Sequence, residues 1–123
     1  YKNGYPPDDS GNGGGFAFDC RALPNPGKIE SLKHFTGMDK PVKDYMEQFS
    51  EVKTFLECVQ NLVDASVKKY IQRDFEHLMV NFGCTGGQHR SVYMAEKLAH
   101  YLSQKYDIRI NVFHTNQLNG EIK

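Results

Sequence analysis

The apolar residues of this chain fall into short runs that alternate with longer stretches of helical spacing. The runs at 16–21 and 77–83 are short and rich in aromatic or aliphatic side chains, which is typical of strands. Between them, apolar residues recur every three or four positions over 52–71, which predicts a helix of about five turns. A second helical stripe covers 90–106, and 108–113 alternates as a last strand.

Shorter elements complete the pattern. Pro24 and Pro26 end the first predicted strand, and 28–35 is expected to form a short helix or turn. Pro41 suits the first turn of a helix over 42–49. Strands separated by helical crossovers predict one small α/β domain with a mixed, mostly parallel sheet.

Glycine and proline concentrate near the amino terminus, so we expect residues 1–15 to be a flexible linker. The domain itself is expected to span 16–115, and 116–123 to form a tail. Because the chain begins at Tyr1, we expect it to be part of a larger multidomain chain.

Composition narrows the class of protein. Lys plus Arg and Asp plus Glu each total 15, so the formal net charge is zero, which argues against a general nucleic-acid or membrane-surface binder. The three cysteines form no CxxC pair, which disfavours a disulfide framework and a zinc site and favours a reducing compartment. Cys58 falls beside the stripe at 52–71 and is expected in the core. Without a signal-peptide pattern or a long apolar run, a soluble cytoplasmic protein is expected.

The junction between the second strand and the last helix carries side chains suited to phosphate. In open α/β sheets, ligands bind where strand ends meet helix amino termini. Gly86 and Gly87 let backbone N–H groups face an anion, and the helix directs its positive end toward the same place. Hydroxyl, imidazole and guanidinium donors follow: Thr85, Ser91, His89 and Arg90. A plain turn needs no such set, so we predict a phosphorylated small-molecule ligand here.

Three motif interpretations compete at this loop. The Walker A pattern GxxxxGK[ST] fails, because Gln88 and His89 stand where its second glycine and its lysine belong. The dinucleotide pattern GxGxxG is also not matched. Cys84, Arg90 and Ser91 do fit the C-x5-R-[ST] arrangement of cysteine-dependent phosphatases. There, the cysteine thiolate is the nucleophile and the arginine holds the phosphate.

Asp19 and Arg21 lie two residues apart on the first strand and therefore share a face near the loop. They form either a structural ion pair or part of the ligand site, and in the phosphatase interpretation Asp19 is the candidate general acid. His114 is a further candidate at the same edge. Three other histidines show no spacing typical of metal ligands: His34, His77 and His100. Neither a metal nor a cofactor is therefore predicted.

Three blocks of the sequence stand out: FDCRALPNP (18–26), LKHFTGMDKPV (32–42) and GCTGGQHRSVY (83–93). In their order and spacing, they resemble the C-terminal domain of the RapZ family of bacterial RNase adapter proteins. The resemblance implies a non-catalytic α/β domain that senses glucosamine-6-phosphate, assembles as an oligomer and in some members presents a regulatory RNA to a ribonuclease. The nucleotide-binding Walker motifs of that family belong to a separate N-terminal domain.

Transferred onto this sequence, the resemblance implies ligand contacts in the loop and at the first strand: Cys84, Thr85, Gly86, Gly87, His89, Arg90, Ser91, Asp19 and Arg21. The middle block adds Thr36, Gly37 and Asp39. Two departures are visible. The segment 115–123 carries one Lys and one Glu where RNA-binding members have a basic tail, which argues against RNA binding. Gly27 stands where an aromatic or histidine side chain can follow the LPNP turn.

Overall fold

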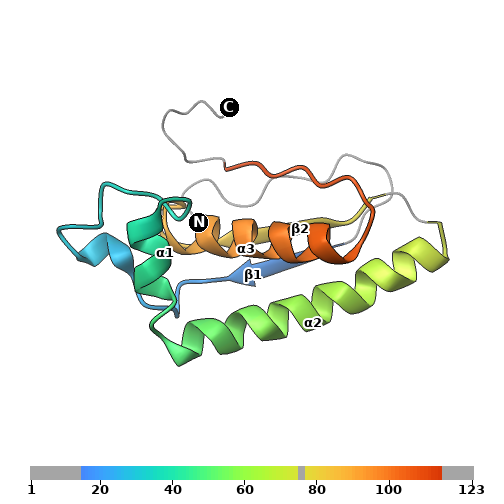
Figure 1. The fold of residues 1–123 in the computed structure, drawn as a ribbon, viewed down its shortest axis with the longest axis horizontal. Helices are drawn as coiled ribbons and strands as arrows, with labels where there is room; N and C mark the ends of the chain where they lie inside the picture. Colours follow the sequence, from blue (N-terminus) through green and yellow to red (C-terminus); the bar gives the residue numbers. More distant parts are fainter. Residues whose placement is uncertain (1–14, 75–76, 115–123) are drawn as a thin grey trace.

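The computed structural model describes residues 15–74 and 77–114, so the predicted linker over 1–15, except its last residue, and the tail over 116–123 lie outside the described residues. Two parallel strands and three α-helices follow one another along the chain (Figure 1). The elements are β1 (Gly15–Asp19), the 3-10 turn η1 (Pro26–Lys28), α1 (Lys40–Met46), α2 (Ser50–Gln72), β2 (Met79–Gly83) and α3 (Arg90–Lys105). The predicted α/β class, with a parallel pair joined by a helical crossover, is confirmed.

The two strands pair because their aromatic side chains cover one face of the sheet. In the parallel register Phe18 is the partner of Phe82, and their rings stack with centroids 5.5 Å apart. Phe16 stacks on Phe18 at the same spacing. Phe16, Phe18 and Val80 pack against buried residues of both long helices. The alternation seen in the sequence therefore marks the face that the helices cover.

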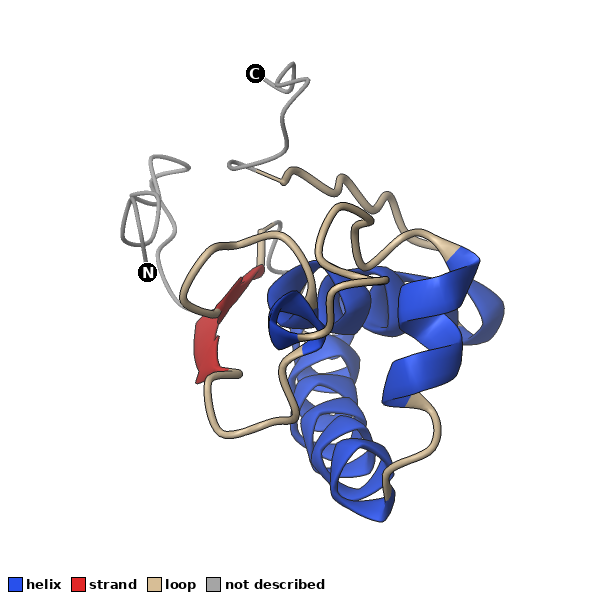
Figure 2. Ribbon diagram, turned by 90° about the vertical axis from the view of Figure 1, so that its left-hand side faces the viewer, coloured by secondary structure: helices blue, strands red, loops and turns tan. Residues whose placement is uncertain are grey.

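The long helices lie together on one side of the sheet. Figure 2 shows the strands on one side of the molecule and the helices grouped on the other. On α2 the buried face is a row of valines, and on α3 it includes larger side chains: Val52, Val59, Val63 and Val67, then Met94, Leu98 and Leu102. Each such side chain contributes about 1.5–3 kcal/mol when it is fully withdrawn from water. No helix in the described ranges is long and apolar enough to cross a membrane.

The covered stripe of α2 is narrower than the sequence predicts. Leu62 is 54% exposed and Ile71 is 52% exposed, although both belong to the apolar pattern over 52–71. Cys58 is also exposed, so its expected place in the core was wrong. Apolar spacing identifies the side of a helix that faces the core, but not how far the sheet and its neighbouring helix extend around it.

The last predicted strand is also wrong. Within the described residues the sheet has two strands, and 106–114 has no regular secondary structure. Phe113 is 78% exposed, while Ile110 packs against the core cluster formed by α2 and α3. Alternating side chains report that one face of a segment is covered, whereas a strand also needs a neighbouring edge that accepts its hydrogen bonds.

Candidate functional site

The carboxyl ends of both strands meet the amino terminus of α3 at one end of the molecule, at the left of Figure 1. β1 ends at Asp19 and β2 at Gly83, and these residues are partners in the ladder. The backbone N–H of Cys20 donates to the carbonyl of Gly83 at 2.7 Å, so the pairing continues one residue further. The loop 84–89 then leads into α3, which places the predicted ligand loop at a strand-to-helix junction.

The tip of the loop faces solvent. Thr85 and Gly86 are exposed, and a Cβ added to Gly86 would meet no atom within 4 Å. Gly87 has a φ of 68°, the left-handed region that glycine adopts without a steric cost. The two glycines therefore have different reasons to be there: Gly87 turns the backbone, and Gly86 leaves the entrance open.

Cys84 lies directly below this tip and is only 2% exposed. Its Sγ is 3.4 Å from the backbone N of Ser91 and 3.3 Å from Ser91 Oγ. Burial raises the pKa of the Cys84 thiol, but hydrogen bonds from the hydroxyl and N–H of Ser91 and the N–H of Gly87, together with the charge of Arg90, outweigh it. The pKa of Cys84 therefore lies below its ordinary value.

Arg90 is 5% exposed and fixes the connection that follows β1. Its Nη1 donates to the carbonyl of Arg21 at 2.7 Å and to that of Leu23 at 3.1 Å. Its Nε is buried and has no hydrogen-bond partner among the described residues. One edge of the guanidinium thus holds the backbone, and the donor on the opposite side is unused.

His89 is the second buried polar residue with an unused nitrogen. It is 8% exposed, and its Nε2 has no partner in the described part of the chain. Burial lowers the pKa of His89 more than the nearby backbone carbonyls of the 32–35 segment raise it, which favours a neutral imidazole. A Cβ on Gly27 would lie 3.5 Å from the His89 ring, so a side chain at position 27 would contact this histidine.

Gln88 has a structural role that the sequence pattern did not indicate. Its side-chain Nε2 donates to the backbone carbonyls of Lys33 and Phe35 at 2.8 and 2.9 Å. The backbone carbonyl of Gln88 accepts a hydrogen bond from Gly37 N–H at 3.0 Å. Gln88 therefore ties the segment before α1 to the loop. The available signal was that Gln88 alone, among the polar side chains of the loop, has no evident use around a phosphate.

The middle block builds the turn that carries this segment. Thr36 N–H donates to Asp39 Oδ2 at 2.8 Å, and Met38 N–H donates to Thr36 Oγ1 at 3.1 Å. Gly37 lies against α3, because an added Cβ would stand 2.4 Å from both His89 O and Tyr93 N. Thr36, Gly37 and Asp39 thus position the wall of the site.

Asp19 and Arg21 form an ion pair beside the site. Arg21 Nη2 donates to Asp19 Oδ2 at 2.7 Å, and Arg21 Nε and N–H donate to Oδ1 at 3.0 and 2.9 Å. These hydrogen bonds lower the pKa of Asp19 to about 2. Asp19 is therefore a carboxylate at neutral pH, which suits the ion-pair interpretation better than a general acid.

The other histidines of the sequence have exposed or partly buried side chains. His34, His77 and His100 are exposed, and His114 Nε2 lies 2.7 Å from Glu96 Oε2 on α3. Within 15–74 and 77–114, no three His, Cys, Asp or Glu side chains are grouped to hold a metal ion.

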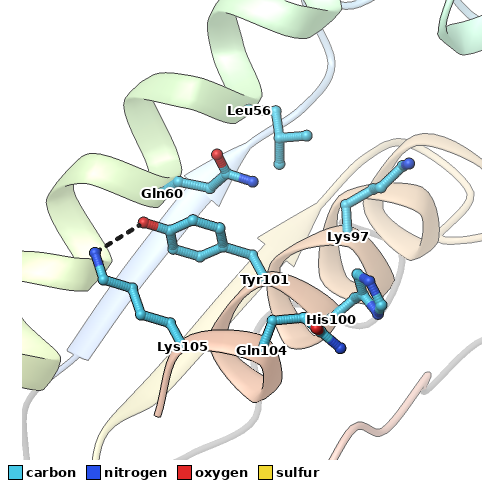
Figure 3. Close-up of a pocket in the computed structure, with 7 residues that line it drawn as sticks. All are labelled: Leu56, Gln60, Lys97, His100, Tyr101, Gln104 and Lys105. Atoms are coloured by element: carbon cyan, nitrogen blue, oxygen red, sulfur yellow. Dashed lines mark hydrogen bonds between the residues drawn. The ribbon is translucent and has the colours of Figure 1, made fainter.

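A hollow of about 450 Å³ lies between α2 and α3. Figure 3 shows its lining from both helices: Leu56, Gln60, Lys97, His100, Tyr101, Gln104 and Lys105. Its two ammonium groups are engaged, since Lys97 pairs with Glu47 and Lys105 with Asp64, each at 2.9 Å. The hollow therefore offers no uncompensated positive charge from these lysines.

Comparison with known proteins places the whole described region in one family. The model of the RapZ C-terminal domain matches residues 1–117. Similar proteins include a nucleotide-binding protein of Endomicrobium trichonymphae, 39% identical over 90% of this chain and 37% of that protein. A nucleotide-binding protein of Staphylococcus epidermidis is 39% identical over 79% of this chain and 32% of that protein. One of Thermosipho africanus is 41% identical over 76% of this chain and 33% of that protein. The chain spans about a third of the length of these relatives.

Proposed function

The chain belongs to the RapZ C-terminal domain family, and from that premise we propose that it is a regulatory domain whose loop 84–91 binds a small phosphorylated ligand without acting on it. An amino-sugar phosphate such as glucosamine-6-phosphate is the proposed ligand. The relatives carry the name nucleotide-binding protein, and a nucleotide would present the same phosphate chemistry. The relatives that carry this name are about three times as long as this chain, so the nucleotide need not bind to the part that this chain matches. The titration described below therefore compares a sugar phosphate with a nucleotide.

The observation that carries the proposal is the pair of unused buried nitrogens, Arg90 Nε and His89 Nε2. A buried donor or acceptor without a partner costs about 1–3 kcal/mol. An anion that enters as the loop opens would satisfy the Arg90 donor and recover that cost. The carbonyls of Arg21 and Leu23 already hold the other edge of the guanidinium. The Arg90 side chain is therefore ordered before the ligand binds, which reduces the entropy lost on binding.

The surrounding backbone favours an anion in the same place. α3 has 16 residues, and its unpaired N–H groups and positive dipole end face the loop. Gly86 leaves the approach open, and Thr85 supplies an exposed hydroxyl at the entrance. These features recognise phosphate, whereas Asp19 beside them is a carboxylate that can accept hydrogen bonds from sugar hydroxyl or amino groups.

The test is a titration of the wild type and Arg90→Lys with glucosamine-6-phosphate, glucosamine, AMP and inorganic phosphate, followed by backbone amide NMR shifts. Lysine keeps the positive charge but has no counterpart to the Nε donor, so we expect at least about tenfold weaker sugar-phosphate binding, which equals 1.4 kcal/mol. Arg73→Lys, an exposed arginine at the end of α2, is the matched control and should bind like the wild type. Equal affinity in Arg90→Lys, or shifts confined to the hollow between α2 and α3, would refute the proposal.

A cysteine-dependent phosphatase is the second candidate, because the lowered pKa of Cys84 and its contact with Ser91 suit a nucleophile. Turnover also requires an acid to protonate the leaving group, and Arg21 keeps Asp19 ionised. The same titration, repeated with p-nitrophenyl phosphate and assayed for released phosphate, distinguishes the two. Release that disappears in Cys84→Ser would make catalysis the function of the loop.

A further inference from the structure

Two cysteine side chains stand side by side where the strands end. Asp19 and Gly83 are partners in the parallel ladder, and the hydrogen bond from Cys20 N to Gly83 O carries the pairing to the next residues, Cys20 and Cys84. Both side chains belong to the same buried cluster, with exposures of 0% and 2%. Neighbouring strands are about 4.8 Å apart, within the separation of about 4.4–6.8 Å between Cα atoms that a disulfide spans.

The two thiols have different surroundings. Cys84 Sγ contacts the N–H and hydroxyl of Ser91 at the positive end of α3, and these groups stabilise a thiolate. Burial and the neighbouring charge of Cys84 raise the pKa of Cys20 to about 12. The pair thus combines one sulfur suited to react first with a neutral thiol beside it.

We propose that Cys20 and Cys84 are a redox-sensitive pair that hydrogen peroxide converts to a disulfide at the floor of the ligand loop. The Cys84 thiolate attacks the peroxide: an S–O bond forms, the O–O bond breaks, and after protonation Cys84 sulfenic acid and one water result. The sulfur of Cys20 then attacks the sulfenic sulfur, forming the S–S bond. The S–O bond breaks, and the hydroxide leaves as a second water with the Cys20 proton.

Access to Cys84 runs through the open side of the loop. Thr85 and Gly86, which follow it, are exposed, and nothing lies within 4 Å of a Cβ position on Gly86. Local opening of such a loop admits a molecule as small as hydrogen peroxide. A disulfide formed here would draw Cys84 Sγ away from Ser91, so oxidation would alter the loop that holds the ligand. That last consequence rests on the proposed function; the disulfide itself does not.

The test treats a Cys58→Ser background with hydrogen peroxide and analyses it by intact mass and peptide mapping. This background removes the exposed thiol, which would otherwise react on its own. We expect the loss of two hydrogens and one linked peptide pair containing Cys20 and Cys84, both reversed by dithiothreitol. Cys20→Ala in the same background should stop at a sulfenic acid that dimedone labels, and Cys84→Ala should leave Cys20 unmodified.

Saturating inorganic phosphate should slow the reaction, because an anion over the loop disfavours the thiolate and covers the entrance. If phosphate does not change the rate, the link between oxidation and the ligand site is contradicted. The linked peptide would still demonstrate the disulfide between Cys20 and Cys84. The proposal is overturned if Cys20 remains a free thiol after Cys84 has been oxidised, or if both sulfurs stay reduced while exposed Cys58 of the wild type is consumed.

Discussion

A single missing side chain decides how closely the segment before α1 approaches α3. Gly37 has no Cβ, and its N–H reaches the carbonyl of Gln88 at 3.0 Å. The place where a Cβ would stand is filled by backbone atoms of His89 and Tyr93, which cannot move without disturbing the first turn of α3. Gly86, four residues before Arg90 in the loop, has open space at the same position. The two glycines therefore allow a matched experiment.

We predict that Gly37→Ala lowers the free energy of unfolding by about 1–3 kcal/mol, the usual cost of forcing a methyl group into a packed site. Gly86→Ala should change it by no more than about 0.5 kcal/mol, as surface substitutions do. Urea denaturation of both variants measures the difference. Identical midpoints for the two would show that the segment at Gly37 does not pack on α3 as described.

Among the elements, the end of α3 is connected to α2 by a cluster of polar side chains. Tyr106 Oη donates to Asp64 Oδ1 at 2.6 Å, and Lys105 Nζ donates to Asp64 Oδ2 at 2.9 Å. The Asp64 side chain is 14% exposed, so these contacts are partly shielded from water. They hold the start of the segment over 106–114 and account for its position beside the core.

The pKa of Asp64 is lowered mainly by the hydrogen bond from Tyr106 and, to a smaller extent, by the one from Lys105. A carboxyl whose pKa is lowered on folding stabilises the fold above its ordinary pKa, near 3.9, and this stability is lost as the pH falls through the lower folded value. Asp64→Asn should therefore reduce the melting temperature by a few degrees at pH 7, with a smaller deficit at pH 3. Asp44→Asn, which breaks the exposed pair with Lys40, is the control and should change little at either pH. A deficit that does not depend on pH would contradict the assignment to Asp64.

At the scale of the whole molecule, charge bears on the RNA-binding role that the family resemblance raises. The chain carries 15 basic and 15 acidic residues. Several lysines are engaged with acids in the structure, among them Lys40, Lys97 and Lys105. Binding to RNA depends on positive charges that neutralise phosphates, so balanced charge leaves little to drive it.

We predict that this chain alone binds a structured RNA no tighter than about micromolar at ~150 mM salt, with a shallow dependence of affinity on salt concentration. Fluorescence anisotropy at several salt concentrations measures both quantities. A tight complex with a steep salt dependence would indicate that an assembly of copies gathers lysine and arginine on one face.

Local patterns along the chain were sufficient to predict the order and type of the main elements and the position of the loop. Periodicity in β1, α2, β2 and α3 is a local property of consecutive residues, so it predicted these elements with ends close to those observed. The junction of β2 and α3 follows from that order, and its glycine and phosphate-suited side chains could be named in advance. The apolar pattern was insufficient for 108–113, because a strand also requires a partner edge.

Which residues far apart in the chain become neighbours could be seen only from the way the chain is folded. Arg90 is turned toward the carbonyls of Arg21 and Leu23, 69 and 67 residues away, and Gln88 toward Lys33 and Phe35. Cys20 and Cys84 become neighbours only through the register of the parallel strands. Such contacts depend on how the crossover through α1 and α2 returns the chain to the sheet, and no local spacing in the sequence encodes that distance.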